Sequence, residues 1–356
     1  NVFYSTSILV CFFNEYQYHC KGVIMNILKK TISVFLMILL IAGVFTSCGS
    51  SDKKQSDKSL QIVTTVFPAY DWTKEILGDR AEDAELTMLL DDGVDVHSYQ
   101  PTAEDLEKIA SCDLFIYVGG ESDEWVEDAL KSKTNKNRVE INLMDALGDS
   151  VKEEEEVEGM QSEEEHEHEG EEAESEEPEQ DEHIWLSLRN AEVCTQAIAD
   201  QLKKLDPSNK TEYEDNATAY KEELTGLDKE YQDTVEHAKR KTLLFADRFP
   251  FRYLADDYGL KYYAAFKGCS AETEASFKTI TFLANKVNEE NLPYVMTIEG
   301  SDHKIAKSVI SNTKKKTQQI LTMDSMQSTT AQDVKDGKSY LSVMEENLSV
   351  LQKALN

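Results

Sequence analysis

One long amphipathic helix constrains the fold of this 356-residue chain more than any other feature. Apolar side chains recur in steps of three and four at Tyr213, Ala217, Tyr220, Leu224, Leu227, Tyr231 and Val235. This spacing places them along one face of a helix of about 30 residues, roughly 45 Å long. We expect a helix over residues 206–239 that links two lobes. A coiled-coil dimer is the alternative interpretation.

Strand-like and helix-like segments alternate on both sides of this helix. Strands are predicted before it near 60–66, 85–92, 113–120 and 138–144, and after it at 241–247, 260–266, 293–299 and 317–324. Helical patterns lie between these segments. Such alternation is typical of α/β folds with parallel sheets. The sequence therefore predicts an α/β fold with lobes at 60–205 and 240–356.

The N-terminal region has the layout of a secretory signal. A basic start at Met25 is followed by an apolar stretch that ends in TSCGS at Cys48, which resembles a bacterial lipobox. We expect a lipoprotein signal peptide over 25–47, lipidation of Cys48 and a polar tether over 48–59. Residues 1–24 are interpreted as translated upstream sequence. A transmembrane anchor is the alternative, but the apolar run is short for a span.

The remaining cysteines, Cys112, Cys194 and Cys269, are too few and too scattered for a disulfide framework. We expect them to be buried small hydrophobic residues.

Negative charge is concentrated in one segment of the chain. The formal net charge is −31, and much of it lies between residues 152 and 182. This charge argues against a nucleic-acid partner, which requires a basic surface. Because the segment 149–182 has no apolar periodicity, we expect it to be disordered. Its histidines, His166 and His168, lie among glutamates that could bind divalent metal weakly.

Four potential metal ligands lie where α/β folds place their sites, in loops beyond strand ends. His97 follows the second strand, and His183 stands at the exit of the acidic segment. Asp247 and Asp324 end the first and last strands of the second lobe. Two imidazoles and two carboxylates suit Zn²⁺ or Mn²⁺.

Three segments resemble zinc- and manganese-binding proteins of bacterial ABC importers. They are GVDVHSYQPTAEDLEKIASCDLFIYVGGESDEW, DEHIWLSLRNAE and YLADDYGLKYYAAFKGCSAETEAS. The first two contain His97 and His183, which the resemblance implies are first-lobe ligands. The resemblance covers about residues 60–356. It implies two α/β lobes joined by one rigid long helix, with the metal in the cleft between them.

The resemblance also implies ligands from the second lobe. A third ligand, His or Glu, is expected after that lobe's first strand, but this chain has FADRFPFRY there. Arg248 falls at the family position, and a guanidinium cannot bind a cation. Asp247 is the nearest competent residue. Asp324 matches the fourth ligand.

Two further features follow from the resemblance. Glu274 matches a glutamate that supports the ligands; the alternative is an acid stabilised at a helix N-terminus. Zinc-binding members carry a histidine- and acid-rich loop where this chain has 149–182. His166 and His168 are therefore candidate auxiliary metal ligands, and a solvated spacer is the alternative.

Together these features predict a monomeric receptor, lipid-anchored on the extracytoplasmic face of a bacterial membrane. It would bind Zn²⁺ and deliver it to an ABC permease and its ATPase, without catalysing a reaction. A manganese receptor is the alternative, because loss of the third histidine makes the site richer in oxygen. A secreted zinc hydrolase would need a catalytic motif such as HExxH, which the sequence lacks. An adhesin would need no metal site.

Overall fold

The computed structural model describes residues 59–161, 179–270 and 274–356. Ser59–Asn356 forms one compact unit. The predicted signal peptide, Cys48, His166 and His168 lie outside the described residues.

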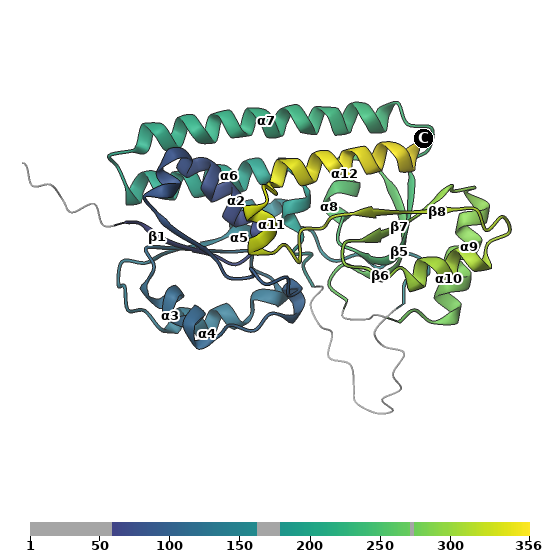
Figure 1. The fold of residues 1–356 in the computed structure, drawn as a ribbon, viewed down its shortest axis with the longest axis horizontal. Coiled ribbons are helices and arrows are strands. Elements are labelled where there is room, and N and C mark those ends of the chain that lie inside the picture. The colour runs from purple at the N-terminus through teal and green to yellow at the C-terminus, as the bar shows by residue number, and fades with distance from the viewer. Residues whose placement is uncertain (1–58, 162–178, 271–273) are drawn as a thin grey trace, which may run out of the picture. The chain divides into compact units, whose positions relative to one another are not determined.

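The first lobe is built on a parallel sheet with the strand order β2-β1-β3-β4 in the described chain. Its strands are β1 (Gln61–Thr64), β2 (Glu85–Met88), β3 (Leu114–Tyr117) and β4 (Val139–Asn142). Its helices are α2 (Phe67–Leu77), α3 (Ala103–Ser111), α4 (Trp125–Lys131), α5 (Leu143–Leu147) and α6 (Leu188–Leu205). Helices α2 and α6 lie on one side of the sheet, and α3 and α4 lie on the other (Figure 1).

The second lobe repeats this plan with the order β6-β5-β7-β8, again parallel. Its strands are β5 (Thr242–Phe249), β6 (Lys261–Lys267), β7 (Tyr294–Ile298) and β8 (Gln319–Met323). Its helices are α8 (Arg252–Tyr258), α9 (Phe277–Glu289), α10 (Lys304–Asn312), α11 (Ala331–Lys335) and α12 (Tyr340–Leu355). The prediction of two α/β lobes is confirmed.

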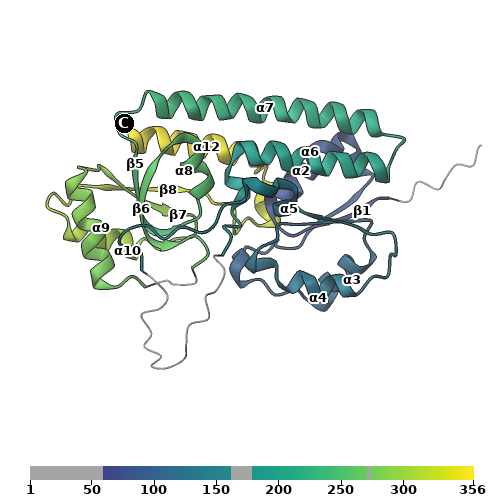
Figure 2. The same cartoon turned by 180° about the vertical axis from the view of Figure 1, so that it is seen from behind.

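The long helix α7 (Lys210–Glu236) has 27 residues and runs along the helices of both lobes. It packs against α2 and α6 of the first lobe and against α12 of the second, as both ribbon views show (Figures 1 and 2). All seven stripe residues from Tyr213 to Val235 are buried. The apolar stripe is therefore used inside this chain, against both lobes.

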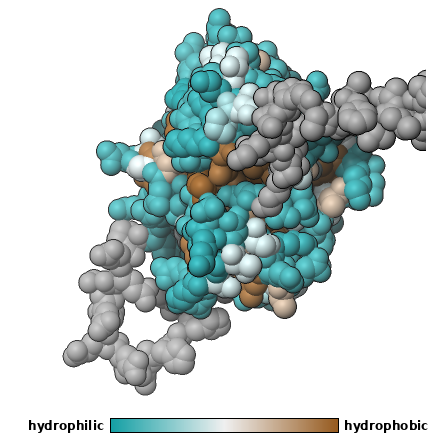
Figure 3. Space-filling model, turned by 90° about the vertical axis from the view of Figure 1, so that its left-hand side faces the viewer, coloured by the Kyte–Doolittle hydropathy of each residue, from teal (hydrophilic) through white to brown (hydrophobic). Residues whose placement is uncertain are grey.

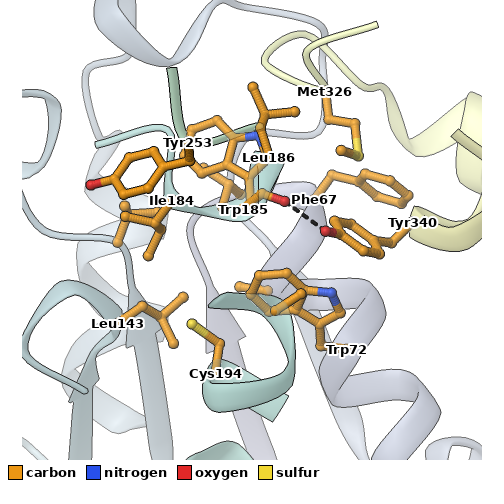
Figure 4. Close-up of a cluster of buried hydrophobic side chains, with 14 of the residues drawn as sticks. Phe67, Trp72, Leu143, Ile184, Trp185, Leu186, Cys194, Tyr253, Met326 and Tyr340 are labelled. Carbon is orange, nitrogen blue, oxygen red and sulfur yellow. Dashed lines mark hydrogen bonds between the residues drawn. The ribbon is translucent and has the colours of Figure 1, made fainter. Parts of the chain in front are cut away.

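A buried turn, Ile184–Leu186, lies where the two lobes meet (Figure 4). The indole Nε1 of Trp185 donates to the carbonyl of Ser325 at 2.8 Å, and the Trp185 carbonyl accepts from the Tyr340 hydroxyl at 2.6 Å. Trp72 packs edge-on against Tyr340, with ring centroids 5.2 Å apart. Side chains from both lobes thus share one apolar core at the junction.

The acidic segment is ordered on both sides of its undescribed part. Gln161 donates its backbone N–H to the Ala265 carbonyl at 2.9 Å, and Met160 is buried. The prediction of disorder over 149–182 is therefore wrong for 149–161 and 179–182. The composition misled because a few apolar residues among the glutamates are enough to dock the segment onto the second lobe.

The face shown in Figure 3 is largely hydrophilic, and its hydrophobic side chains are mostly recessed between hydrophilic ones. Within the described ranges, no helix combines the length and the apolar character needed to cross a bilayer.

Asp71 provides a test of the packing between α2 and α12. Its buried carboxylate accepts the backbone N–H of Tyr340 at 2.8 Å, and burial raises its pKa to about 6. The folded protein therefore holds a proton that the unfolded chain releases between about pH 4 and 6, so the free energy of unfolding falls as pH rises through this window. Asp71→Asn keeps an oxygen that can accept the Tyr340 N–H but cannot ionise. In this variant we expect the decrease in the free energy of unfolding between pH 4 and 7 to be smaller by up to about 3 kcal/mol.

Urea unfolding of both proteins at pH 4 and pH 7 measures this effect. Other groups titrate in both proteins, so the difference between the two pH dependences isolates Asp71. Parallel pH dependences would show that Asp71 is already ionised when folded.

Candidate metal centre

His97 is presented by a short turn after β2. Asp95 begins the 3₁₀ turn Val96–Ser98, and its carboxylate accepts the backbone N–H of His97 at 3.1 Å. The preceding loop is tied to the second lobe, because Ala331 donates its N–H to the Asp91 carbonyl at 2.7 Å. The position of His97 therefore depends on both lobes.

His183 immediately precedes the buried Ile184–Leu186 turn and is itself fully buried. The second lobe approaches its ring through Gly268, which follows β6. A Cβ at Gly268 would lie 3.0 Å from Cε1 and 3.1 Å from Nδ1 of His183. Only a glycine lets the backbone come this close without moving the ring.

The two imidazoles converge through their Nε2 atoms, which lie 3.3 Å apart. On the opposite side of each ring, Nδ1 faces a buried carboxylate. His183 Nδ1 is 2.9 Å from Asp181 Oδ1, and His97 Nδ1 is 3.0 Å from Glu182 Oε1. Ser122 also donates its hydroxyl and its backbone N–H to Glu182. The acidic segment thus supplies the partners that orient both rings.

Electrostatics at the centre reflect this pairing. Burial alone would raise the pKa of Glu182, but its hydrogen bond with His97 and the nearby His183 hold that pKa below its usual value. Burial alone would lower the pKa of His183, but the Asp181 carboxylate, helped by Glu182 and Glu154, raises that pKa above its usual value. The pairing with Asp181 therefore favours positive charge on the His183 ring.

This geometry creates a position for a cation. A carboxylate only accepts hydrogen bonds, so each Nδ1 carries the proton and a neutral ring has its lone pair on Nε2. Two such lone pairs aimed at each other repel unless a proton or a metal ion lies between them. Imidazoles oriented by carboxylates in this way are common around protein-bound metals.

Gln327, from the second lobe, completes the surroundings of the two rings. Its amide nitrogen lies 3.3 Å from His97 Nε2 and also contacts His183 Nε2. Its amide oxygen is buried without a hydrogen-bond partner. Glu299 fixes the loop that carries Gln327 by accepting backbone N–H groups from Ser325 at 2.7 Å and Gln327 at 3.2 Å. Sequence reasoning missed Gln327, although it follows Asp324 closely.

Cys269 also lies at the centre, which corrects its interpretation as an ordinary buried residue. One ligand atom each from His97, His183 and Cys269 lies within 4.8 Å of the others. The thiol is partly exposed, whereas Cys112 and Cys194 are buried as predicted. Desolvation and the neighbouring acids raise the pKa of the Cys269 thiol. Its place just beyond β6 is the signal that sequence reasoning could have used.

Asp247 lies inside β5, not beyond the end of that strand, next to an irregularity in the pairing of β5 with β6. Its carboxylate accepts backbone N–H groups from Arg248 at 3.0 Å and Ile298 at 3.4 Å. Arg248 pairs with Asp95 of the first lobe, Nη2 to Oδ2 at 2.5 Å. The structure does not bring the Asp247 carboxylate into the group formed by the two histidines and Cys269.

Asp324 follows β8 as predicted, but its carboxylate faces other partners. Oδ2 lies 2.7 Å from Lys338 Nζ, and Oδ1 accepts the Met326 N–H at 2.7 Å. Glu274 is exposed, and its carbonyl accepts from Gln161 at 3.4 Å. Neither carboxylate belongs to the described histidine–cysteine group. Their assigned roles stay predictions.

A cavity of about 530 Å³ opens beside His97. Its lining includes His97 and Asp95 from the first lobe and Asp247, Arg248 and Glu299 from the second. Residues of both lobes thus line a cavity next to His97.

Two parallel-sheet lobes with paired histidines between them define a metal-binding protein of the two-lobed, solute-binding class. Residues 62–354 match the family model described as zinc-uptake complex component A, periplasmic (ZnuA), and the chain belongs to this family. The zinc-binding lipoprotein AdcA of Streptococcus pneumoniae is 33% identical over 326 residues, covering 91% of this chain and 61% of the relative. The chain thus spans less than two thirds of that relative.

A relative of similar length and a solved structure agree with this assignment. The high-affinity zinc uptake system protein ZnuA of Bacillus subtilis is 31% identical over 325 residues, covering 89% of this chain and 97% of the relative. The Zn(II)-bound ZnuA-like domain of Streptococcus pneumoniae AdcA superimposes with a TM-score of 0.64 at 30% identity, covering 83% of this chain and 99% of that domain.

Glu182→Gln tests the orientation of His97 by its carboxylate. We expect Zn²⁺ affinity to fall about 10–100-fold, because partners behind a ligand typically contribute that much. Competition with a chromophoric chelator measures the change. Glu104→Gln is the matched control, since Glu104 is exposed and pairs with Lys108 on α3. Equal Zn²⁺ affinity in the two variants would show that Glu182 does not support metal binding by His97.

Proposed function

We propose that this protein is an extracytoplasmic receptor that binds Zn²⁺ between its lobes and delivers it to an ABC permease and its ATPase. The observation that carries the proposal is the convergence of two carboxylate-oriented imidazoles, with Nε2 atoms 3.3 Å apart. Neutral imidazole is a preferred zinc ligand. His97 and His183 are therefore the proposed first-lobe ligands.

The known relatives support zinc as the transported ion. The Streptococcus pneumoniae relative is named a zinc-binding lipoprotein, and its ZnuA-like domain was solved with Zn(II) bound. By the same analogy, we infer that this chain is held at the outer face of the membrane by a lipid on Cys48. We also propose that it acts as a monomer, because the apolar stripe of α7 is buried within the chain. A receptor of this kind catalyses no reaction, because its metal is enclosed by ligands rather than left open to a substrate.

Manganese is the second candidate, favoured by the carboxylates of Asp247 and Glu299 on the cavity wall. Carboxylate oxygens suit Mn²⁺, whereas paired imidazoles favour Zn²⁺. Metal analysis of protein purified without chelator, followed by titration of the stripped protein with each ion, separates the two candidates.

We expect one tightly bound Zn²⁺ per chain, with a lower affinity for Mn²⁺. His97→Ala and His183→Ala should each weaken zinc binding at least about 100-fold, because each removes a ligand rather than a supporting partner. Isothermal titration calorimetry measures the loss, and circular dichroism checks that the variants fold. His237→Ala is the matched control, since that exposed histidine bonds only to the Asp233 carbonyl within the described contacts. Unchanged affinity in either site variant would overturn the assignment.

We also propose that His166 and His168 form weaker auxiliary sites with neighbouring glutamates. Deleting residues 162–178 keeps the flanking segments that dock onto the second lobe. The deletion should leave one tight site and remove additional weak zinc equivalents at neutral pH. Protonation of the imidazoles should weaken these extra sites near pH 6. Equal zinc stoichiometry with and without the segment would make it a solvated spacer.

A further inference from the structure

The two histidines leave a bound Zn²⁺ short of ligands, because zinc sites in proteins are usually four-coordinate. Among the described residues, the one further histidine, cysteine or acidic side chain grouped with both rings is Cys269. Its Sγ lies within 4.8 Å of the imidazole ligand atoms. Zinc bonds of about 2.0–2.1 Å to nitrogen and about 2.3 Å to sulfur place the two ligand atoms at most about 4.4 Å apart, so this spacing needs at most a small approach of the sulfur to the rings.

The backbone holds Cys269 in this position. It follows Gly268, whose close approach to the His183 ring brings the chain against the centre. The Cys269 N–H donates to the Glu154 carboxylate at 3.0 Å, and Glu154 in turn pairs with Lys267 at 3.2 Å. The residue is therefore anchored from β6 on one side and from the ordered acidic segment on the other.

A second observation also indicates a ligand at this point. The amide of Gln327 lies against both Nε2 atoms, its side chain is only 4% exposed, and its buried oxygen has no hydrogen-bond partner. The two ends of an amide are interchangeable by rotation. Turning it places the oxygen, an acceptor, toward the two rings, where a cation would satisfy it.

The alternative carboxylates are committed elsewhere. Asp247 accepts backbone N–H groups within the second lobe, and Asp324 pairs with Lys338. Arg248, which stands where the family supplies a ligand, pairs with Asp95. The second lobe therefore offers the centre a sulfur and an amide oxygen.

We propose that Cys269 is the third protein ligand of the zinc receptor, as a thiolate, with the amide oxygen of Gln327 in the fourth position. This inference rests on the proposed function and adds the identity of the second-lobe ligands. On binding, the S–H bond breaks, a zinc–sulfur bond forms, and the thiol proton passes to the solvent. The thiol thus contributes one released proton for each ion bound.

This ligand set determines which metal the protein prefers. Thiolate is a soft ligand that suits Zn²⁺, whereas Mn²⁺ favours oxygen donors. Cys269 thus restores the zinc preference that loss of the family's third ligand would otherwise weaken. Replacing the sulfur with oxygen should reduce the margin by which Zn²⁺ outcompetes Mn²⁺.

The test uses the full chain loaded with Co²⁺ in place of zinc, together with zinc titrations. Wild type should show the near-ultraviolet charge-transfer absorption of a thiolate–Co²⁺ bond, and Cys269→Ser should lose it. Zinc affinity of Cys269→Ser should fall at least about 100-fold, with a smaller loss for Mn²⁺. Cys112→Ala is the matched control, because that buried thiol bonds to the Ile109 carbonyl in the first lobe. It should keep both the absorption and the affinity.

Alkylation provides an independent measurement on the folded wild-type protein. One equivalent of Zn²⁺ should protect the peptide containing Cys269 from iodoacetamide, as mapped by mass spectrometry. Tight zinc binding without thiolate absorption, with unchanged affinity in Cys269→Ser, would overturn this inference and leave the proposed function standing. A larger loss in Asp247→Ala than in Cys269→Ser would assign the third position to Asp247. Absence of tight zinc binding in wild type would instead overturn the function.

Discussion

The burial of the Ile184–Leu186 turn between the lobes is the constraint on which the site depends (Figure 4). Through Trp185 this turn bonds to the Ser325 carbonyl and the Tyr340 hydroxyl, both in the second lobe. His183 directly precedes it, and Gln327 lies just beyond Ser325. The same contacts that join the lobes therefore set the distance between first-lobe and second-lobe groups at the centre. An apolar junction with a few buried hydrogen bonds can hold this distance constant, because close-packed interiors resist small displacements.

Two buried carboxylates determine the charge at the centre. Asp181 and Glu182 are buried, and each faces an imidazole. Buried carboxylates are costly to desolvate unless a positive charge compensates them. A protonated ring can supply that charge, and the proposed metal ion would supply it in the loaded protein. On the cavity wall, Arg248 is neutralised by Asp95, so its charge opposes an entering cation less than a free guanidinium would.

The chain's pattern predicted most of the architecture and part of the site. The alternation of strands and helices and the long helix follow from local periodicity. His97 and His183 were singled out by their expected loop positions together with the resemblance to metal receptors. The disorder predicted for 149–161 was wrong, because Met160 is buried and the backbone N–H of Gln161 bonds to the Ala265 carbonyl of the second lobe. Cys269 was taken for a small hydrophobic residue, since a lone cysteine in sequence carries no sign of its neighbours. Asp247 was placed at the end of a strand that in fact continues to Phe249.

The sequence by itself determined the two α/β lobes and the apolar stripe of α7. Both depend on the periodic spacing of apolar side chains, which can be recognised within a short stretch of sequence. It also determined that two histidines would stand at loops with acidic neighbours. Only the tertiary structure decided which groups meet. The centre brings together His97, His183, Cys269 and Gln327, and 230 residues separate the first of these from the last. Their approach depends on how the two lobes pack. Ligand distance is a property of that packing, which no local pattern encodes.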